Sequence, residues 1–369
     1  MPIRPLFALF LTAILASAGV MAQTPPGDKD EVLRVETQLV DVPVVVTDKA
    51  GKAVLGLKKN NFVVYEDGKP QDLEEFSTTS APFEVALLLD TSGSTRSELQ
   101  LIQRAAQNFI SLLRPGDRVA IVSFNTFRDG DSASAGVQVL TPLTQDRAQL
   151  SAALEKVGTS NGTPYYDGLI EIAGKIFKNQ PAAEYRGRRA LVALTDGVDS
   201  VSASDFSEAQ EMLSAEGIIN FFIQVDTRPF FEENLLGNCL GAMRFSARQI
   251  RRYYAAFGSK ANLERTEDFC KLGDFEKLAI SKRLYEIADS EINTLAKSSG
   301  GKVFPAADLS EARLAFRTVA DTIGTQYRLG YYSSNDKRDG TLRKIKVDVK
   351  GLPPGSVVRA REGYTAPTK

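Results

Sequence analysis

The stretch that decides the fold is residues 85–94, which read VALLLDTSGS. The five apolar residues before Asp90 are typical of a parallel strand that is buried on both faces, because a half-exposed strand would alternate. An apolar run that ends in an aspartate returns at residues 190–196 and again at residues 218–226. Three such runs predict strands whose carboxyl ends carry acidic side chains.

Helical patterns separate these strands. Apolar positions at helical spacing fall on one face of residues 102–113, 150–157 and 165–176, and of a segment that starts at Ser310. Strands that alternate with amphipathic helices predict an α/β fold with a doubly wound, mostly parallel sheet, covered on both faces as in Rossmann-like domains.

Both flanks of this region contain strand patterns. In residues 32–80, an Asp67-Gly68 pair between extended runs predicts a β-hairpin. Residues 326–369 contain further apolar and alternating runs. Neither flank has enough strands to be stable alone, so we expect them to pair into one small β-sandwich beside an α/β domain at residues 81–325.

The first 31 residues are expected to lie outside these domains. Residues 1–22 combine one cation, a short apolar run and small residues, the pattern of a secretory signal peptide, with an uncleaved anchor as the alternative. Residues 23–31 are polar and contain a Pro pair, which favours a disordered leader. We therefore expect a secreted or periplasmic protein with no membrane span after signal cleavage.

The composition excludes several kinds of chemistry. The 369 residues include no histidine, which removes Ser-His-Asp and Cys-His mechanisms and His-ligated zinc or haem sites. The 45 Lys and Arg residues nearly balance the 46 Asp and Glu residues, so no overall basic charge attracts nucleic acid. A functional site must therefore be built from carboxylates, hydroxyls, amides and amines.

Five oxygen-bearing residues follow the predicted strands or precede a helix, and these are Asp90, Ser92, Ser94, Thr163 and Asp196. Ligands of open α/β sheets bind outside the carboxyl ends of the strands, so we expect the five side chains in one crevice. Hard cations prefer an all-oxygen set, which predicts a site for Mg²⁺ or Mn²⁺. The alternative is that these residues only cap turns and helices through local hydrogen bonds.

On these five residues, residues 83–325 resemble a von Willebrand factor type A domain, and the whole chain looks like the secreted bacterial proteins labelled VWFA-related. The resemblance implies a metal-ion-dependent adhesion site. In that family the serines and the threonine ligate the metal directly or through water, and the aspartates act mostly through water. The resemblance also implies a protein partner that supplies an Asp or Glu carboxylate to the metal.

An insertion at about residues 228–285 makes this region longer than is usual in the family. It is either a helical subdomain with its own small core or one wall of the ligand site, where arginines would bind an acidic partner. The candidate partner-binding residues are Arg248, Arg251, Arg252 and Tyr254. Cys239 and Cys270 are expected to form a disulfide after export, with two separate buried thiols as the alternative.

Three functions remain after these observations. The first is a non-enzymatic, metal-dependent protein-binding module for adhesion or assembly. The second is a structural envelope component in which the metal only stabilises the fold. The third is a metal- or Ser-dependent hydrolase, but without histidine and with few direct carboxylate ligands the metal would generate hydroxide poorly. We therefore expect a binding module that is not an enzyme.

Overall fold

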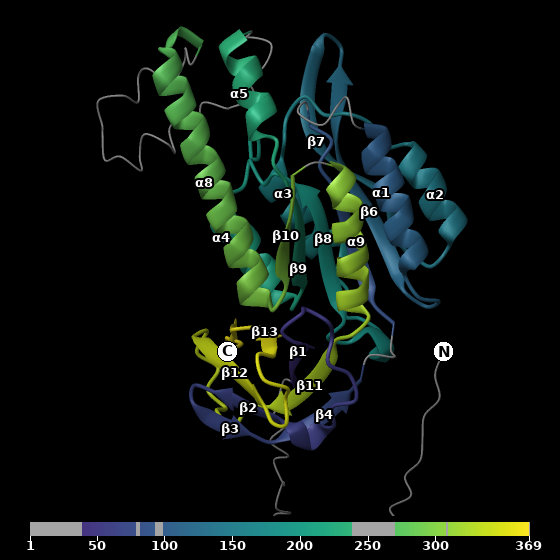
Figure 1. The fold of residues 1–369 in the computed structure, drawn as a ribbon, viewed down its shortest axis with the longest axis vertical. Helices are drawn as coiled ribbons and strands as arrows, with labels where there is room; N and C mark the ends of the chain where they lie inside the picture. Colours follow the sequence, from purple (N-terminus) through teal and green to yellow (C-terminus); the bar gives the residue numbers. More distant parts are fainter. Residues whose placement is uncertain (1–38, 79–81, 93–98, 238–269, 308, 369) are drawn as a thin grey trace, which may run out of the picture. The chain divides into compact units, whose positions relative to one another are not determined.

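The computed structural model describes residues 39–78, 82–92, 99–237, 270–307 and 309–368. All of them belong to one compact unit, residues 37–369, which contains an α/β domain and a β-sandwich (Figure 1). None of the helices in this described part is long and apolar enough to cross a membrane.

A six-stranded sheet forms the centre of the α/β domain (Figure 1). Its strands lie in the order β10 (Lys302–Ala306), β9 (Ile219–Val225), β8 (Arg189–Thr195), β5 (Glu84–Leu89), β6 (Arg118–Asp129) and β7 (Ser132–Thr144). The first five are parallel, which confirms the predicted mostly parallel sheet, and β7 is antiparallel to β6. The edge strand β7 was not predicted, because it contains Gly136 and Pro142, which are typical of turns. An edge strand tolerates both residues.

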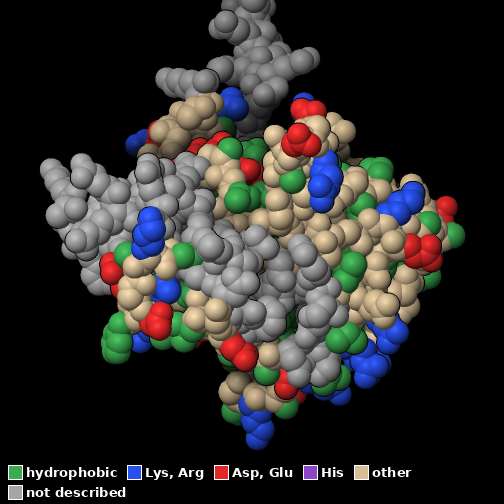
Figure 2. All heavy atoms as spheres, turned by 90° about the horizontal axis from the view of Figure 1, so that it is seen from above, with side chains coloured by type: hydrophobic (Ala, Val, Ile, Leu, Met, Phe, Trp, Pro, Cys, Tyr) green, Lys and Arg blue, Asp and Glu red, His purple; other side chains and the backbone are tan. Residues whose placement is uncertain are grey.

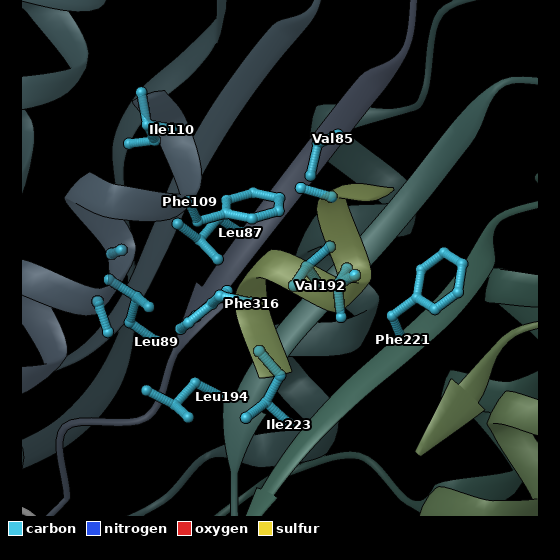
Figure 3. Packing of buried hydrophobic residues seen from close by; sticks show 14 of the residues in the cluster. Val85, Leu87, Leu89, Phe109, Ile110, Val192, Leu194, Phe221, Ile223 and Phe316 are labelled. Atoms are coloured by element: carbon cyan, nitrogen blue, oxygen red, sulfur yellow. The ribbon is translucent and has the colours of Figure 1, made fainter. Parts of the chain in front are cut away.

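Helices cover both faces of this sheet. One face carries α1 (Leu99–Leu112), α2 (Arg147–Glu155) and α9 (Leu309–Ile323), and the other carries α3 (Tyr165–Glu171), α4 (Phe206–Ala215) and α8 (Asp274–Ser299). Alternate residues of β5 point to opposite faces, so Leu87 and Leu89 pack with Phe109 of α1 and Phe316 of α9 (Figure 3), whereas Leu88 joins the other cluster. This explains why the β5 sequence is apolar without alternation.

The β-sandwich combines strands from both ends of the described chain. One sheet contains β13 (Val357–Ala360), β1 (Leu39–Thr47), β11 (Tyr327–Tyr332) and β4 (Leu73–Ser77); the other contains β14 (Gly363–Thr365), β12 (Leu342–Val349), β2 (Phe62–Glu66) and β3 (Lys69–Gln71). The predicted sandwich of the two flanks is therefore confirmed. Asp67 and Gly68 both have positive φ, 48° and 82°, and connect β2 to β3 as the predicted hairpin turn.

A buried glutamate links the two ends of the chain inside the sandwich. Glu66 is 3% exposed and accepts hydrogen bonds from the hydroxyls of Tyr331 (2.7 Å), Tyr364 (2.9 Å) and Ser333 (2.6 Å). Arg343, 2% exposed, completes the group with a guanidinium nitrogen 3.4 Å from the carboxylate. Burying a charge is tolerated only with such partners.

The helix α8 begins at Asp274 and has 26 residues, so it extends from the insertion to the end of the sheet. Its buried positions include Ile280, Leu284, Ala288 and Ile292, spaced by four residues with polar residues between them, which makes the pattern weak in the sequence. The described parts of the insertion are α5 (Arg228–Gly237), residues 270–273 and the first turns of α8.

Candidate metal site

Two loops that carry predicted site residues are joined at the carboxyl-terminal edge of the parallel strands. This is the upper edge in Figure 1, where α5 follows β9. The backbone N–H of Asp90, after β5, donates to the carbonyl oxygen of Leu194 at 2.9 Å. The hydroxyl of Thr195, at the end of β8, donates to the Asp90 carboxylate at 2.8 Å. The loops after β5 and β8 are therefore held against each other.

A third loop, before α3, is bonded to both of the others. The N–H of Ser160 donates to the carbonyl oxygen of Thr91 at 2.9 Å. The N–H of Thr163 donates to the hydroxyl of Ser200 at 2.7 Å, and the N–H of Ser200 returns a bond of 2.9 Å to the carbonyl oxygen of Thr163. The three loops thus form a closed set of pairwise contacts, as the strand order predicts.

Four of the five predicted metal ligands are on these loops. Asp90 is 2% exposed, and Ser92 and Thr163 are each 6% exposed. Asp196 is half-buried at the end of β8. Ser94 lies outside the described residues. Two aspartates and two hydroxyls therefore gather at one edge of the sheet with little access to water.

The two aspartates influence each other. Burial raises the pKa of Asp90, and hydrogen bonds from Thr195 and from the N–H of Ser92 (3.1 Å) oppose that rise. Burial and the negative charge of Asp90 together raise the pKa of Asp196 to about 7. A pair of buried carboxylates that repel each other is a favourable place for a cation.

The structure adds residues that the sequence analysis missed. The hydroxyl of Thr227 donates to the Asp196 carboxylate and lies 2.9 Å from the hydroxyl of Tyr285 on α8. Thr227 follows Asp226 after the end of β9. The sequence pattern at this strand end drew attention to the aspartate and gave no sign of the threonine's role. Asp226 itself is exposed and accepts a bond from the N–H of Arg228 at 3.2 Å, consistent with solvation rather than ligation.

Asp199 caps a helix instead of joining the site. Its carboxylate accepts the backbone N–H groups of Tyr165 (3.0 Å) and Tyr166 (3.4 Å) in the first turn of α3, and the hydroxyl of Ser202. Asp199 thus satisfies N–H groups at the start of α3, as a helix cap does. Burial nevertheless raises the pKa of Asp199 to about 6.

The donor set fits a hard cation. A cavity of about 10 Å³, roughly the space of one water molecule or ion, is lined by Asp90, Asp196, Thr195 and Thr227 together with three apolar side chains. The hydroxyl of Tyr165 is fully buried without a hydrogen-bond partner among the described residues, and the nearby charges of both aspartates help to raise its pKa.

The donor set is unlike a zinc or cluster site. Within the described ranges no group of three or more Cys, Asp, Glu or His side chains is placed to hold a metal. Figure 2 views this edge from above and shows acidic and basic side chains scattered over its described surface.

The insertion is only partly described. Arg248, Arg251, Arg252 and Tyr254, the candidate partner-binding residues, lie outside the described residues, and so does Cys239. The predicted disulfide therefore stays a prediction. Cys270 packs against a small cluster formed by Leu235, Ile280 and Leu284. Val198, two residues after Asp196, contacts the same cluster, so the base of the insertion lies against a metal-site loop.

Comparisons with known proteins agree with this architecture. A family model described as von Willebrand factor type A domain matches residues 85–198. None of the curated protein sequences matches the chain at a significant level.

Several solved structures are similar in part. A von Willebrand factor type A protein from Catenulispora acidiphila is 12% identical, with a TM-score of 0.43 over 90% of this chain and 75% of that chain. Proximal thread matrix protein 1 from the mussel byssus is 13% identical, with a TM-score of 0.42 over 66% and 48%. A further structure of that mussel protein, with a zinc-occupied MIDAS motif, is 13% identical, with a TM-score of 0.41 over the same shares.

This chain spans about half the length of the mussel protein. The fold class rests on the sheet and the helices described above, and the family on the sequence match across β5 to β8. Residues 85–198 therefore match the von Willebrand factor type A domain family.

Proposed function

We propose that this protein is an exported, non-enzymatic module that binds a protein partner through Mg²⁺ or Mn²⁺ at the site of Asp90 and Asp196. The observation that carries the proposal is the closed contact between three loops, which brings the buried Asp90 and the half-buried Asp196 to one small cavity. Members of this domain family often bind metal and mediate protein interactions. The partner would be a protein that presents an Asp or Glu side chain.

The residues of the site would contribute two kinds of metal ligand. Asp90 and Asp196 supply the negative charge, and the hydroxyls of Ser92, Ser94 and Thr163 supply neutral oxygen ligands. The cation, when bound, acts as a Lewis acid that accepts a carboxylate oxygen from the partner. With mostly neutral ligands around it, the cation would keep enough net charge to attract that carboxylate.

The supporting threonines would position the aspartates. Thr195 and Thr227 each donate to one carboxylate oxygen of Asp90 and Asp196, respectively. Each carboxylate oxygen has a second lone pair, so these bonds fix orientation while leaving acceptor capacity for a hydrated ion. Tyr285 holds Thr227 in turn, which connects the site to α8 and to the insertion.

The insertion supports the idea of a ligand wall. Its small apolar cluster includes Val198 from the metal-site loop, so its base is continuous with the site rather than a separate core. A wall at this position would contact the partner around the metal-bound carboxylate and would contribute to selection of the partner.

Mg²⁺ titration calorimetry on the wild type, Asp90→Ala and Asp226→Ala tests the metal site. Asp226 is the matched control, because it is an exposed aspartate at the end of the adjacent strand β9. We expect Asp90→Ala to lose Mg²⁺ binding with an unchanged circular dichroism spectrum, and Asp226→Ala to bind as the wild type does. Equal Mg²⁺ affinity in all three would reject the site.

Capture of partners from envelope extract tests the binding function. We expect capture in Mg²⁺, loss of capture with a chelator, and no capture by Asp90→Ala. If a chelator lowers the melting temperature while capture persists, the metal only stabilises the fold, and the structural alternative replaces the proposal.

A further inference from the structure

A second cavity, of about 450 Å³, lies where the β-sandwich meets the α/β domain. Its lining includes Gly187 and Gly217, which come just before β8 and β9, so it opens at the amino-terminal edge of the sheet. The metal site is at the opposite edge of the same strands. The volume is in the range of small-molecule sites, which usually hold a few placed polar groups among apolar and aromatic side chains.

The acidic side chains in this cleft are already paired. Glu216 lies 3.1 Å from the guanidinium of Arg189. Asp41 accepts a bond of 2.7 Å from Nε of Arg328, a residue of β11 that also pairs with Glu75. Asp41 also attracts Arg361 and Arg186 through its charge, but it forms no ion pair with either of them among the described residues.

Arg361 lines the cleft without an ion pair to any described carboxylate. Its Nε donates to the carbonyl oxygen of Gly363 at 3.0 Å, and its terminal nitrogens lie 3.3 Å and 3.5 Å from the carbonyl oxygens of Asp41 and Ser214. A guanidinium has five N–H donors, so two remain without these partners. Burial lowers the pKa of Arg361, and the charges of Tyr331 and Asp41 oppose that fall.

A second guanidinium and two aromatic rings lie in the same cleft. Arg186 is exposed and forms no ion pair with the described residues. Tyr364 packs against Arg361, with 5.9 Å from the guanidinium carbon to the ring centre. Tyr332 is 47% exposed, far more than the other tyrosines of β11. The cleft thus presents, beside a partly exposed ring, two arginines that form no ion pair with the described residues.

We propose that this cleft binds a small organic anion whose oxyanion group accepts hydrogen bonds from Arg361 and Arg186 and whose uncharged part lies against Tyr332. Arginine matches the geometry of carboxylate and phosphate oxygens and binds both in a bidentate manner. The partly exposed ring of Tyr332 favours an organic ligand over a bare inorganic ion. An anion here would compensate a buried charge that the described residues leave unpaired.

Titration of the ¹⁵N-labelled full chain, saturated with Mg²⁺, tests this proposal through the arginine Nε–H signals. The probes are benzoate, its neutral isostere benzamide, and inorganic phosphate. We expect saturable shifts of the Arg361 signal with benzoate, and at least tenfold weaker binding of benzamide, because charged hydrogen bonds are the stronger ones. Tighter binding of phosphate than of benzoate would identify a phosphorylated ligand, and the reverse order a carboxylate.

Arg186→Gln is the informative variant, since an exposed side chain can be replaced without loss of the fold. We expect about a tenfold loss of benzoate affinity, the effect of one charged hydrogen bond. Arg317→Gln, an exposed arginine on α9, is the control and should bind as the wild type does. The proposal is overturned if neither anion gives a saturable shift, if benzamide binds as well as benzoate, or if Arg186→Gln binds benzoate unchanged.

Discussion

Replacement of Glu66 by alanine should destabilise the β-sandwich strongly. The substitution removes the hydrogen-bond acceptor of the Tyr331 hydroxyl, the ion pair to Arg343 and the bond from Tyr364. Removal of one partner from a buried ion pair costs about 3–5 kcal/mol, because the other charge stays buried. Arg343 would keep its bond of 2.8 Å to the carbonyl oxygen of Lys337, so the ionic part falls at the lower end of that range.

The hydroxyls add to this cost. The Tyr331 side chain is fully buried, and an unsatisfied buried hydroxyl costs about 1–3 kcal/mol. We therefore expect a loss of about 4 kcal/mol in the free energy of unfolding, a large share of the ordinary stability of a domain. Urea unfolding followed by tyrosine fluorescence and by circular dichroism measures this loss by linear extrapolation.

Two further variants separate the causes. Glu66→Gln keeps the shape and the acceptor oxygen but removes the charge, so it should lose less than Glu66→Ala. Glu74→Ala, an exposed glutamate on β4, is the control and should change the free energy of unfolding by less than about 0.5 kcal/mol. A loss below about 1 kcal/mol for Glu66→Ala would refute the idea that this carboxylate joins the two ends of the chain.

Thr227→Val should weaken Mg²⁺ binding severalfold, because it removes the hydrogen bond that orients the Asp196 carboxylate. Thr227→Ser keeps the hydroxyl and should bind Mg²⁺ as the wild type does. Equal Mg²⁺ affinities of Thr227→Val and the wild type by calorimetry would contradict the positioning role. Asp199→Ala should cost about 1 kcal/mol of stability as a lost helix cap, and Asp199→Asn less, by urea unfolding. Burial raises the pKa of Asp199 to about 6, so the native protein binds this proton more tightly than the unfolded protein does. In the presence of a chelator, the wild type should therefore lose stability relative to Asp199→Asn as the pH rises from about 4 to 6. Above about pH 6 the difference in stability should stay constant. Gly301→Ala should unfold the protein, because a Cβ at this position would lie 2.0 Å from the carbonyl oxygen of Asn220. Gly237→Ala is the control, because a Cβ there meets no atom within 4 Å. A Gly301→Ala variant that is soluble and unfolds cooperatively would contradict this prediction.

Local patterns predicted the elements that depend on local chemistry. The apolar run before Asp90 and the Asp67-Gly68 turn are recognisable because a buried strand and a tight turn each require particular residues in sequence. The same reasoning placed Asp90 and Asp196 at strand ends, where parallel topology brings them together. The edge strand β7 escaped prediction because it contains Gly136 and Pro142, residues that are typical of turns.

Features that depend on distant segments escaped prediction altogether. Thr227 bonds to Asp196 because β9 lies beside β8, and an ordinary threonine after a strand gives no sign of that role. The arginine cleft is formed by segments near residues 41, 186 and 361, which only the sandwich brings together. Such sites are visible only once the strand order is known.

The interleaved sandwich also has a consequence for how the chain folds. The strand β1, with five buried valines, pairs with β11 and β13, and Leu39 lies opposite Tyr332, far along the sequence. A chain that emerges from its N-terminus first must therefore hold an unpaired apolar strand until almost every other residue has followed. Contacts this distant in sequence slow folding and leave strand edges open to other chains. A nascent or truncated chain that ends before β11 would thus be prone to aggregation, and complete synthesis would precede stable folding.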